Sequence, residues 1–241
     1  MKTELSTKEK IIKETKLTGV LPCIKVKREV DYVAYAKAMY NGGARIVEVT
    51  MTSPGALKAI ENIASKLAGK IWVAAGTVLD SNTAKAVVDH GGSLIVSPTV
   101  NPEVIDTAIS HGVPVYSGAF TASECKLALD NGASMVKIFP AHLGGPAYMT
   151  NLKMVLPSID LIPSGGINEK TASEYIRSGA CAVSGARTFL NEKAIKKEGL
   201  DWISRKVAIF ISLVKEAKNI GIKTNIPMIY TPLYLYFSYN R

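Results

Sequence analysis

A lysine inside an apolar strand-like segment is the residue of this sequence best suited to chemistry. Lys137 lies in the stretch Val136–Pro140, where its neighbours are apolar and Pro140 ends the run. An ammonium group in such a place either reaches water through its flexible stem or gives up its proton. The neutral amine is a nucleophile toward ketones. Taken alone, the segment leaves a structural role and a catalytic role open.

Glu48 is the candidate partner of this lysine. In residues 45–50 Glu48 alternates with two valines, and in residues 134–139 Lys137 alternates with a valine and an isoleucine. Successive strand residues point to opposite faces, so both charged side chains face away from the valines. A carboxylate and an amine in a dry interior make a base and a nucleophile with coupled protonation. The alternative is a buried ion pair, which is a weak stabilising device.

The positioning elements alternate regularly between strand and helix. Strands are predicted near residues 18–24, 45–50, 71–75, 93–97, 114–117, 134–139, 160–163 and 181–184. Helices are predicted near residues 4–16, 30–40, 53–68, 80–90, 101–110, 121–130, 146–156, 168–178 and 198–218. Eight strand–helix units of this size predict an α/β fold, a closed (β/α)8 (TIM) barrel in a single domain. An open doubly wound sheet is the alternative, but its Gly-rich loop is missing after the first strand.

We expect the barrel to occupy residues 1–219, with residues 4–16 as a short helix that covers one end. In the third predicted helix, Pro54 is expected in the first turn. Residues 220–241 form a Tyr-rich C-terminal tail, in which residues 225–241 hold four of the ten tyrosines. This tail would pack along the barrel or a neighbouring subunit, or stay disordered.

Charge and cysteine usage narrow the classes of function. The net charge of +9 lies on the two ends of the chain, because residues 45–190 carry 11 basic and 11 acidic residues. Solvated helix faces explain this better than a nucleic-acid groove. No apolar run approaches the roughly 20 residues that span a bilayer. The odd set Cys23, Cys125 and Cys181 argues against disulfides and zinc, and favours a reducing cytoplasm.

Two glycine-containing strand ends predict an anion site. Residues 163–168 contain Gly165 and Gly166, and residues 183–187 contain Gly185, Ala186 and Arg187. The loops after the seventh and eighth strands are the usual phosphate site of a (β/α)8 barrel. We therefore expect a phosphorylated substrate, with Arg187 either adding charge or lying exposed.

Three further residues and the histidines complete the candidates. Gly76–Thr77 offers N–H and hydroxyl donors to a carboxylate, or simply caps a helix. Pro98 and Phe139 supply rigid apolar walls. The three histidines, His90, His111 and His142, lack metal-ligand spacing and are predicted to be ordinary surface residues.

Together these strand ends resemble the class I aldolases for 2-keto-3-deoxy-6-phosphogluconate and 4-hydroxy-2-oxoglutarate. The matching pieces, in register from about residue 18 to 190, are residues 42–50, 75–79, 95–98, 136–140 and 163–167. The resemblance implies that Lys137 forms a Schiff base with a keto acid and that Glu48 shuttles protons. It implies that Thr77 holds the carboxylate beside Pro98 and Phe139.

The same resemblance assigns the phosphate to Gly165, Gly166, Gly185 and Ala186. It further implies cleavage to pyruvate and glyceraldehyde 3-phosphate without metal or cofactor, a homotrimer, and a place in the Entner–Doudoroff pathway of carbohydrate metabolism. The phosphogalactonate and 4-hydroxy-2-oxoglutarate substrates stay open as alternatives.

The sequence departs from the family at the substrate-binding positions. Family members supply an arginine to the carboxylate, and Thr52 and Pro22 stand at the two places where it is expected. Thr52 is therefore a candidate substrate-binding residue, and Lys25 or Arg28 could replace the missing charge. Ala186 stands where a phosphate-binding serine is common.

Two other classes of function remain open. A phosphosugar epimerase or isomerase on the same fold would not need Lys137. A non-catalytic phosphosugar-binding barrel would account for the missing arginine. All three readings take a small molecule and no nucleic acid or membrane as partner.

Overall fold

Eight parallel strands form the centre of the computed structural model, which describes residues 4–223. In chain order the strands are β1 (Val20–Ile24), β2 (Ile46–Thr50), β3 (Trp72–Gly76), β4 (Leu94–Val96), β5 (Val115–Ala119), β6 (Met135–Ile138), β7 (Leu161–Pro163) and β8 (Val183–Gly185). From β1 to β7 each strand pairs with the next, and β1 pairs with β8. Isolated parallel bridges, among them Ser164–Ser184, close the ring between β7 and β8. The predicted (β/α)8 barrel is confirmed.

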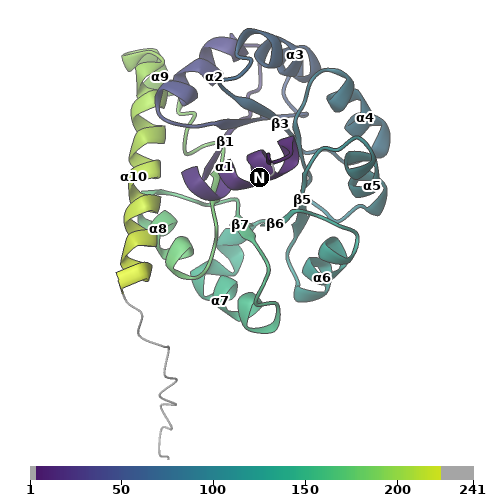
Figure 1. The fold of residues 1–241 in the computed structure, drawn as a ribbon. Helices are drawn as coiled ribbons and strands as arrows, with labels where there is room; N and C mark the ends of the chain where they lie inside the picture. The colour runs from purple at the N-terminus through teal and green to yellow at the C-terminus, as the bar shows by residue number, and fades with distance from the viewer. Residues whose placement is uncertain (1–3, 224–241) are drawn as a thin grey trace, which may run out of the picture.

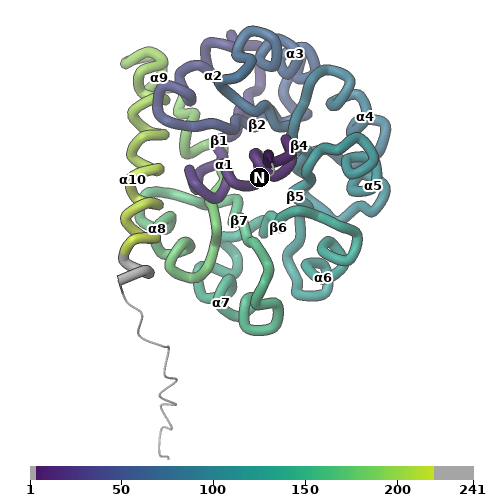
Figure 2. Tube along the Cα trace, in the orientation of Figure 1, coloured from purple at the N-terminus to yellow at the C-terminus, as the bar shows by residue number. Residues whose placement is uncertain are grey.

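Helices surround the ring, and α1 (Thr7–Thr18) lies across one end of it, as Figures 1 and 2 show. They are α1 (Thr7–Thr18), α2 (Tyr32–Asn41), α3 (Ala56–Lys66), α4 (Ser81–Asp89), α5 (Pro102–Ser110), α6 (Ala122–Asp130), the 3₁₀ helix η1 (Ala141–Leu143), α7 (Gly145–Val155), α8 (Glu169–Arg177), α9 (Glu192–Glu198) and α10 (Asp201–Lys223). Four of them are capped by the first residue of a predicted helix range, where an Asp, Asn or Thr side chain accepts backbone N–H bonds: Asp80, Asn101, Thr121 and Asn168.

One local prediction was wrong and one helix was not predicted. Pro54 is not in the first turn of α3, because Gly55 adopts φ +66° as the N-cap and the helix starts only at Ala56. The unpredicted helix is α9, which Gly199, with φ +70°, separates from α10. No residue of α9 is buried, so no amphipathic pattern marked it in the sequence. The helix α10 continues to Lys223, and the rest of the predicted tail lies outside the described residues.

The barrel interior is filled at its N-terminal end. Each strand region contributes an apolar side chain to the inner cluster, and β4 contributes two: Leu21, Ile46, Ala74, Leu94, Val96, Tyr116, Met135, Ile162 and Ala182. The helix α1 crosses this end, as Figure 1 shows, and inserts Ile11 into the cluster. The Thr15 hydroxyl lies 2.6 Å from the Tyr116 hydroxyl, which satisfies both buried groups. The expectation of a helix that covers one end is confirmed, and the free space of the barrel is left at the other end.

The strand alternation predicted for β2 and β6 is also observed. Val47, Val49, Val136 and Ile138 belong to the outer core between strands and helices. The inner face of each strand therefore carries the charged residue. Among residues 4–223, no helix is both long and apolar enough to cross a membrane.

Gly118 allows a close approach between β5 and the end of β4. A Cβ atom built there would lie 2.1 Å from the Pro98 carbonyl carbon and 2.5 Å from the Thr99 nitrogen. We expect Gly118→Ala to lower the free energy of unfolding by about 3 kcal/mol, because backbone must move. Gly112→Ala is the control, since its site is open and only its φ of +70° is unfavourable, costing about 1 kcal/mol. If urea denaturation showed that the two variants lose the same free energy of unfolding, this account would be contradicted.

Candidate active site

Glu48 and Lys137 meet inside the barrel. Glu48 Oε2 lies 3.8 Å from Lys137 Nζ. Only 1% of Glu48 and 8% of Lys137 are exposed. The two residues come from β2 and β6, which lie on opposite sides of the ring, and the inward alternation of each strand aims both side chains at the axis. The predicted approach of the two groups is confirmed.

The contact between these groups is incomplete. A separation of 3.8 Å exceeds hydrogen-bond distance, and Glu48 Oε2 is buried without a hydrogen-bond partner among the described residues. A buried acceptor left unsatisfied costs about 1–3 kcal/mol, and more when it is charged. Stability therefore does not explain the arrangement, which instead leaves a carboxylate oxygen available to a reacting group beside the amine.

A thiol borders the carboxylate on the β1 side. Cys23 pairs in register with Glu48, and its Sγ atom lies 3.3 Å from the Ser184 hydroxyl. Burial, and secondarily the Glu48 carboxylate, raise the pKa of the Cys23 thiol well above its usual range. The thiol therefore stays protonated and is a donor rather than a nucleophile.

Gly76 leaves the room that the Glu48 side chain occupies. A Cβ atom at Gly76 would lie 1.8 Å from Glu48 Oε1 and 2.4 Å from Cδ. The following residue, Thr77, has φ +60°. A β-branched residue rarely adopts that conformation, which costs on the order of 1–3 kcal/mol and is typical of functional sites. The conformation at the end of β3 therefore lowers stability and indicates a functional role.

A cavity of about 550 Å³ opens above the pair at the C-terminal ends of the strands. Thr50 and Phe139, which line it, follow Glu48 and Lys137 by two residues on the same strand faces. The other lining residues are Cys23, Lys25, Pro140, His142, Ser164, Gly165, Gly166, Ile167, Gly185, Ala186, Arg187 and Thr188. None of these residues is acidic, so the cavity suits an anion.

Hydrogen bonds fix the loops that form one wall of this cavity. The Thr188 hydroxyl donates to the Ile167 carbonyl at 2.5 Å, which ties the loop after β8 to the loop after β7. The Ala141 N–H donates to the Ser164 carbonyl at 2.8 Å, and the His142 N–H donates to the Gly165 carbonyl at 3.2 Å. Gly165 and Gly166 adopt φ of +90° and +78°. The glycine loops are therefore held in one arrangement with bare backbone toward the cavity.

The structure brings together most but not all of the predicted site residues. Five of them line the cavity, namely Phe139, Gly165, Gly166, Gly185 and Ala186. Thr52, Thr77 and Pro98 do not line it. Thr77 directly follows Gly76, whose backbone lies against the Glu48 side chain, and the Pro98 backbone lies against Gly118 of β5. Thr52 is exposed and its hydroxyl donates to the Thr50 hydroxyl at 3.4 Å.

Several lining residues were not singled out from the sequence. Cys23 follows Leu21 by two residues on the inner face of β1, so strand alternation could have found it. Lys25, two residues further on, was already a candidate for the missing charge, and it lines the cavity. His142 was expected to be an ordinary surface residue, and it lines the cavity from η1. Nothing periodic marks a three-residue 3₁₀ helix, so the sequence held no signal for this histidine.

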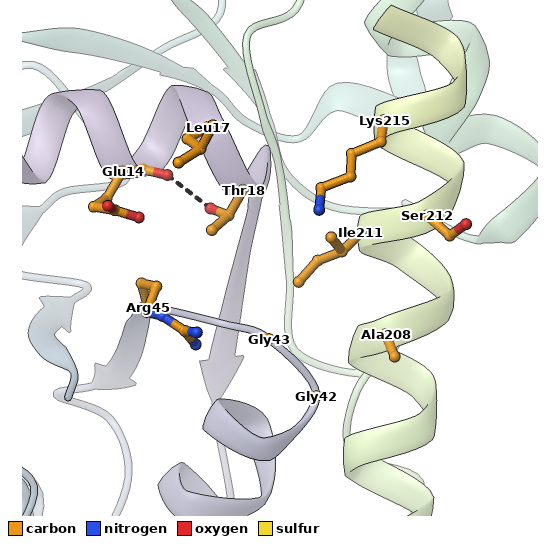
Figure 3. A pocket seen from close by; sticks show the side chains of 10 residues that line it. All are labelled: Glu14, Leu17, Thr18, Gly42, Gly43, Arg45, Ala208, Ile211, Ser212 and Lys215. Carbon is orange, nitrogen blue, oxygen red and sulfur yellow. Dashed lines mark hydrogen bonds between the residues drawn. The ribbon is translucent and has the colours of Figure 1, made fainter. Parts of the chain in front are cut away.

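A second cavity, of about 570 Å³, lies at the opposite end of the barrel (Figure 3). It is bordered by α1 and α10 and carries Glu14, Arg45 and Lys215. Because its charges are mixed and it is remote from the carboxyl ends of the strands, it offers no comparable chemistry. The described residues also contain no group of three His, Cys, Asp or Glu side chains arranged for a metal ion.

Known proteins resemble this chain along most of its length. The family model for "KDPG and KHG aldolase" matches residues 9–206. A 2-dehydro-3-deoxy-phosphogluconate aldolase of Treponema pallidum (strain Nichols) is 37% identical over 158 residues, covering 65% of this chain and 75% of the relative. A 2-dehydro-3-deoxy-6-phosphogalactonate aldolase of Escherichia coli (strain K12) is 32% identical over 201 residues, covering 82% and 96%.

A solved structure adds to these relatives. The crystal structure of KDPG aldolase from Legionella pneumophila holds pyruvate captured at low pH as a covalent carbinolamine intermediate. It matches this chain with a TM-score of 0.75 and 28% identity, covering 82% of this chain and 96% of that one.

The Gly76 contact generates a prediction. We expect Gly76→Ala to push the Glu48 carboxylate away from Lys137 and to slow turnover at this site about 100-fold, the usual contribution of a positioned acid–base group. A crystal structure of the variant and steady-state kinetics measure the two effects. Gly69→Ala, where nothing lies within 4 Å of the new methyl, is the control. Full activity with a displaced carboxylate would remove Glu48 from the chemistry.

Proposed function

Because this chain belongs to the family of KDPG and KHG aldolases, which are carbon–carbon lyases, we propose that it cleaves a 2-keto-3-deoxy-6-phospho sugar acid. The products are pyruvate and glyceraldehyde 3-phosphate, and the route is a class I Schiff base on Lys137. The observation that carries the proposal is the buried amine of Lys137 facing an unsatisfied Glu48 oxygen beneath a cavity without acidic residues.

The chemistry begins with attack of the Lys137 amine on the C2 ketone. The carbinolamine so formed loses water to give a protonated imine. The C3–C4 bond then breaks, its electron pair moves into the imine to give an enamine, and the C4 hydroxyl loses its proton to become the aldehyde. Protonation of the enamine at C3 and hydrolysis of the imine release pyruvate and restore the amine. Glu48 takes and returns the protons, and the Legionella relative with its carbinolamine supports this route.

The carboxylate of the substrate needs a positive partner. Thr77, with its strained backbone, and the apolar Pro98 and Phe139 are assigned to the pyruvyl end. Of the two basic residues that could replace the family's arginine, Lys25 lines the cavity and has no acidic partner among the described residues. Arg28 does not line it and lies 3.8 Å from Glu192. We therefore assign the carboxylate to Lys25.

The phosphate is assigned to the backbone N–H groups of Gly165, Gly166, Gly185 and Ala186. The Treponema relative supports the phosphogluconate-type substrate, and the longer match to the Escherichia coli relative keeps the phosphogalactonate-type substrate as the second candidate.

The remaining proposals concern the cellular context. We propose a homotrimer in the cytoplasm that serves the Entner–Doudoroff pathway, with the barrel of residues 1–219 as one domain. The three free cysteines support a reducing compartment. Light scattering on the purified protein measures the oligomeric state directly.

Borohydride reduction in the presence of pyruvate tests the central step. We expect a reduced pyruvyl adduct on the peptide that contains Lys137, detected by mass spectrometry. Lys137→Met should lose the adduct and lower aldol cleavage by at least about 1,000-fold, because the covalent route is closed. Lys126→Met, an exposed lysine paired with Asp130, is the control. An adduct on another lysine would overturn the site.

Replacement of Lys25 tests the carboxylate assignment. We expect Lys25→Met to raise the KM for pyruvate in the aldol addition about 10- to 100-fold, the loss typical of a charge-assisted hydrogen bond. Lys27→Met, an exposed lysine outside the cavity lining, should change nothing. An unchanged KM for pyruvate would return the assignment to Arg28 or to Thr77 alone.

A further inference from the structure

The cavity above Lys137 carries more side chains suited to an anion than one carboxylate requires. Lys25, His142 and Arg187 line it, and no acidic residue does. All three are exposed, and none has an ion pair or a side-chain hydrogen bond among residues 4–219. With Lys25 assigned to the carboxylate, His142 and Arg187 remain for a second anionic group.

Arg187 lies directly after the glycine turn of β8. It follows Gly185 and Ala186, and Thr188 next to it is tied to the loop after β7. Arg187 also borders a neighbouring cavity of about 350 Å³ beside the start of α8, so it lies where the two cavities meet. A guanidinium in that place can reach an anion held by the glycine backbone, and its planar fork matches a phosphate.

His142 lies against the other glycine loop. A Cβ atom built on Gly166 would lie 2.5 Å from His142 Cβ and 3.4 Å from Nδ1. The imidazole ring is therefore packed over the Gly166 backbone. The hydrogen bond from the His142 backbone N–H to the Gly165 carbonyl holds the backbone from which this side chain extends. An imidazole has at least one N–H donor in every protonation state. It can thus add a donor to whatever the glycine loop binds.

We propose that His142 and Arg187 are specificity-determining residues that hold the terminal phosphate of the substrate. The inference rests on the proposed aldolase function and deepens it. The N–H groups of the glycine loops donate to the phosphate oxygens but carry no net charge, and Ala186 adds no hydroxyl of its own. Arg187 supplies the charge and His142 a fixed donor, so this chain selects phosphorylated over unphosphorylated aldehydes.

The test compares two aldehydes in the addition of pyruvate, glyceraldehyde 3-phosphate and glyceraldehyde. The quantity measured is the ratio of their kcat/KM values. We expect Arg187→Met to lower this ratio about 10- to 100-fold and His142→Ala about 10-fold, as expected for lost charge-assisted hydrogen bonds. His142→Gln, which keeps a side-chain N–H donor, should recover most of the loss. Arg177→Met and His111→Gln, two exposed residues outside the cavity, are the controls.

The outcomes separate this inference from the proposed function. Wild-type protein that traps no pyruvate on Lys137 would defeat the proposed function itself. Normal trapping with an unchanged ratio in the Arg187 and His142 variants would overturn only the phosphate assignment. Loss of pyruvate trapping in these variants would also overturn it, because pyruvate carries no phosphate. A lower ratio in the control variants would point to net charge instead of these two positions.

Discussion

The burial of an amine and a carboxylate at opposite sides of one barrel is the constraint on which the rest of the site depends. Glu48 and Lys137 reach each other only because β2 turns its even-numbered residues inward and β6 turns its odd-numbered residues inward, at the same height in the barrel. Space for them comes from glycines on the neighbouring strands: Gly76 beside Glu48, and Gly118 in register with Lys137. An alanine at Gly76 would occupy the position of the carboxylate itself. The small residues are therefore part of the chemistry, although they contribute no functional group.

The two ends of the barrel divide stability from function. At the N-terminal end α1 inserts Ile11 among apolar side chains and satisfies Tyr116 through Thr15. At the C-terminal end a buried carboxylate oxygen has no partner among the described residues, and Thr77 keeps an unfavourable φ. A buried ion pair seldom stabilises a fold, and the strained backbone of Thr77 adds a further cost in stability. The packed end supplies the stability that lets the open end hold these groups in place.

Strand alternation and turn residues made most of the fold and the central pair predictable from the sequence. The same rule applied to β1 would have found Cys23, which continues the inner face that Leu21 begins and leads to the candidate Lys25. Other features had no local signal. The φ of Thr77 is imposed by its surroundings, α9 buries nothing, and His142 reaches the cavity because hydrogen bonds tie η1 to Ser164 and Gly165. Contacts between distant loops decide these positions, and a single sequence does not contain them.

The charge of the whole chain is a poor guide to the anion site, whereas the pairing of individual charges is informative. Most of the net +9 lies toward the chain ends, outside the region that builds the strands from β2 to β8. On helix surfaces, lysines such as Lys58 and Lys85 lie within 2.7 Å of acidic neighbours, which neutralise their local field. Lys25 and Arg187 at the cavity have no such neighbour among residues 4–219. Unpaired positive charge that faces a concave wall of bare backbone N–H groups is what an anionic substrate meets, and a surface count of lysines cannot reveal it.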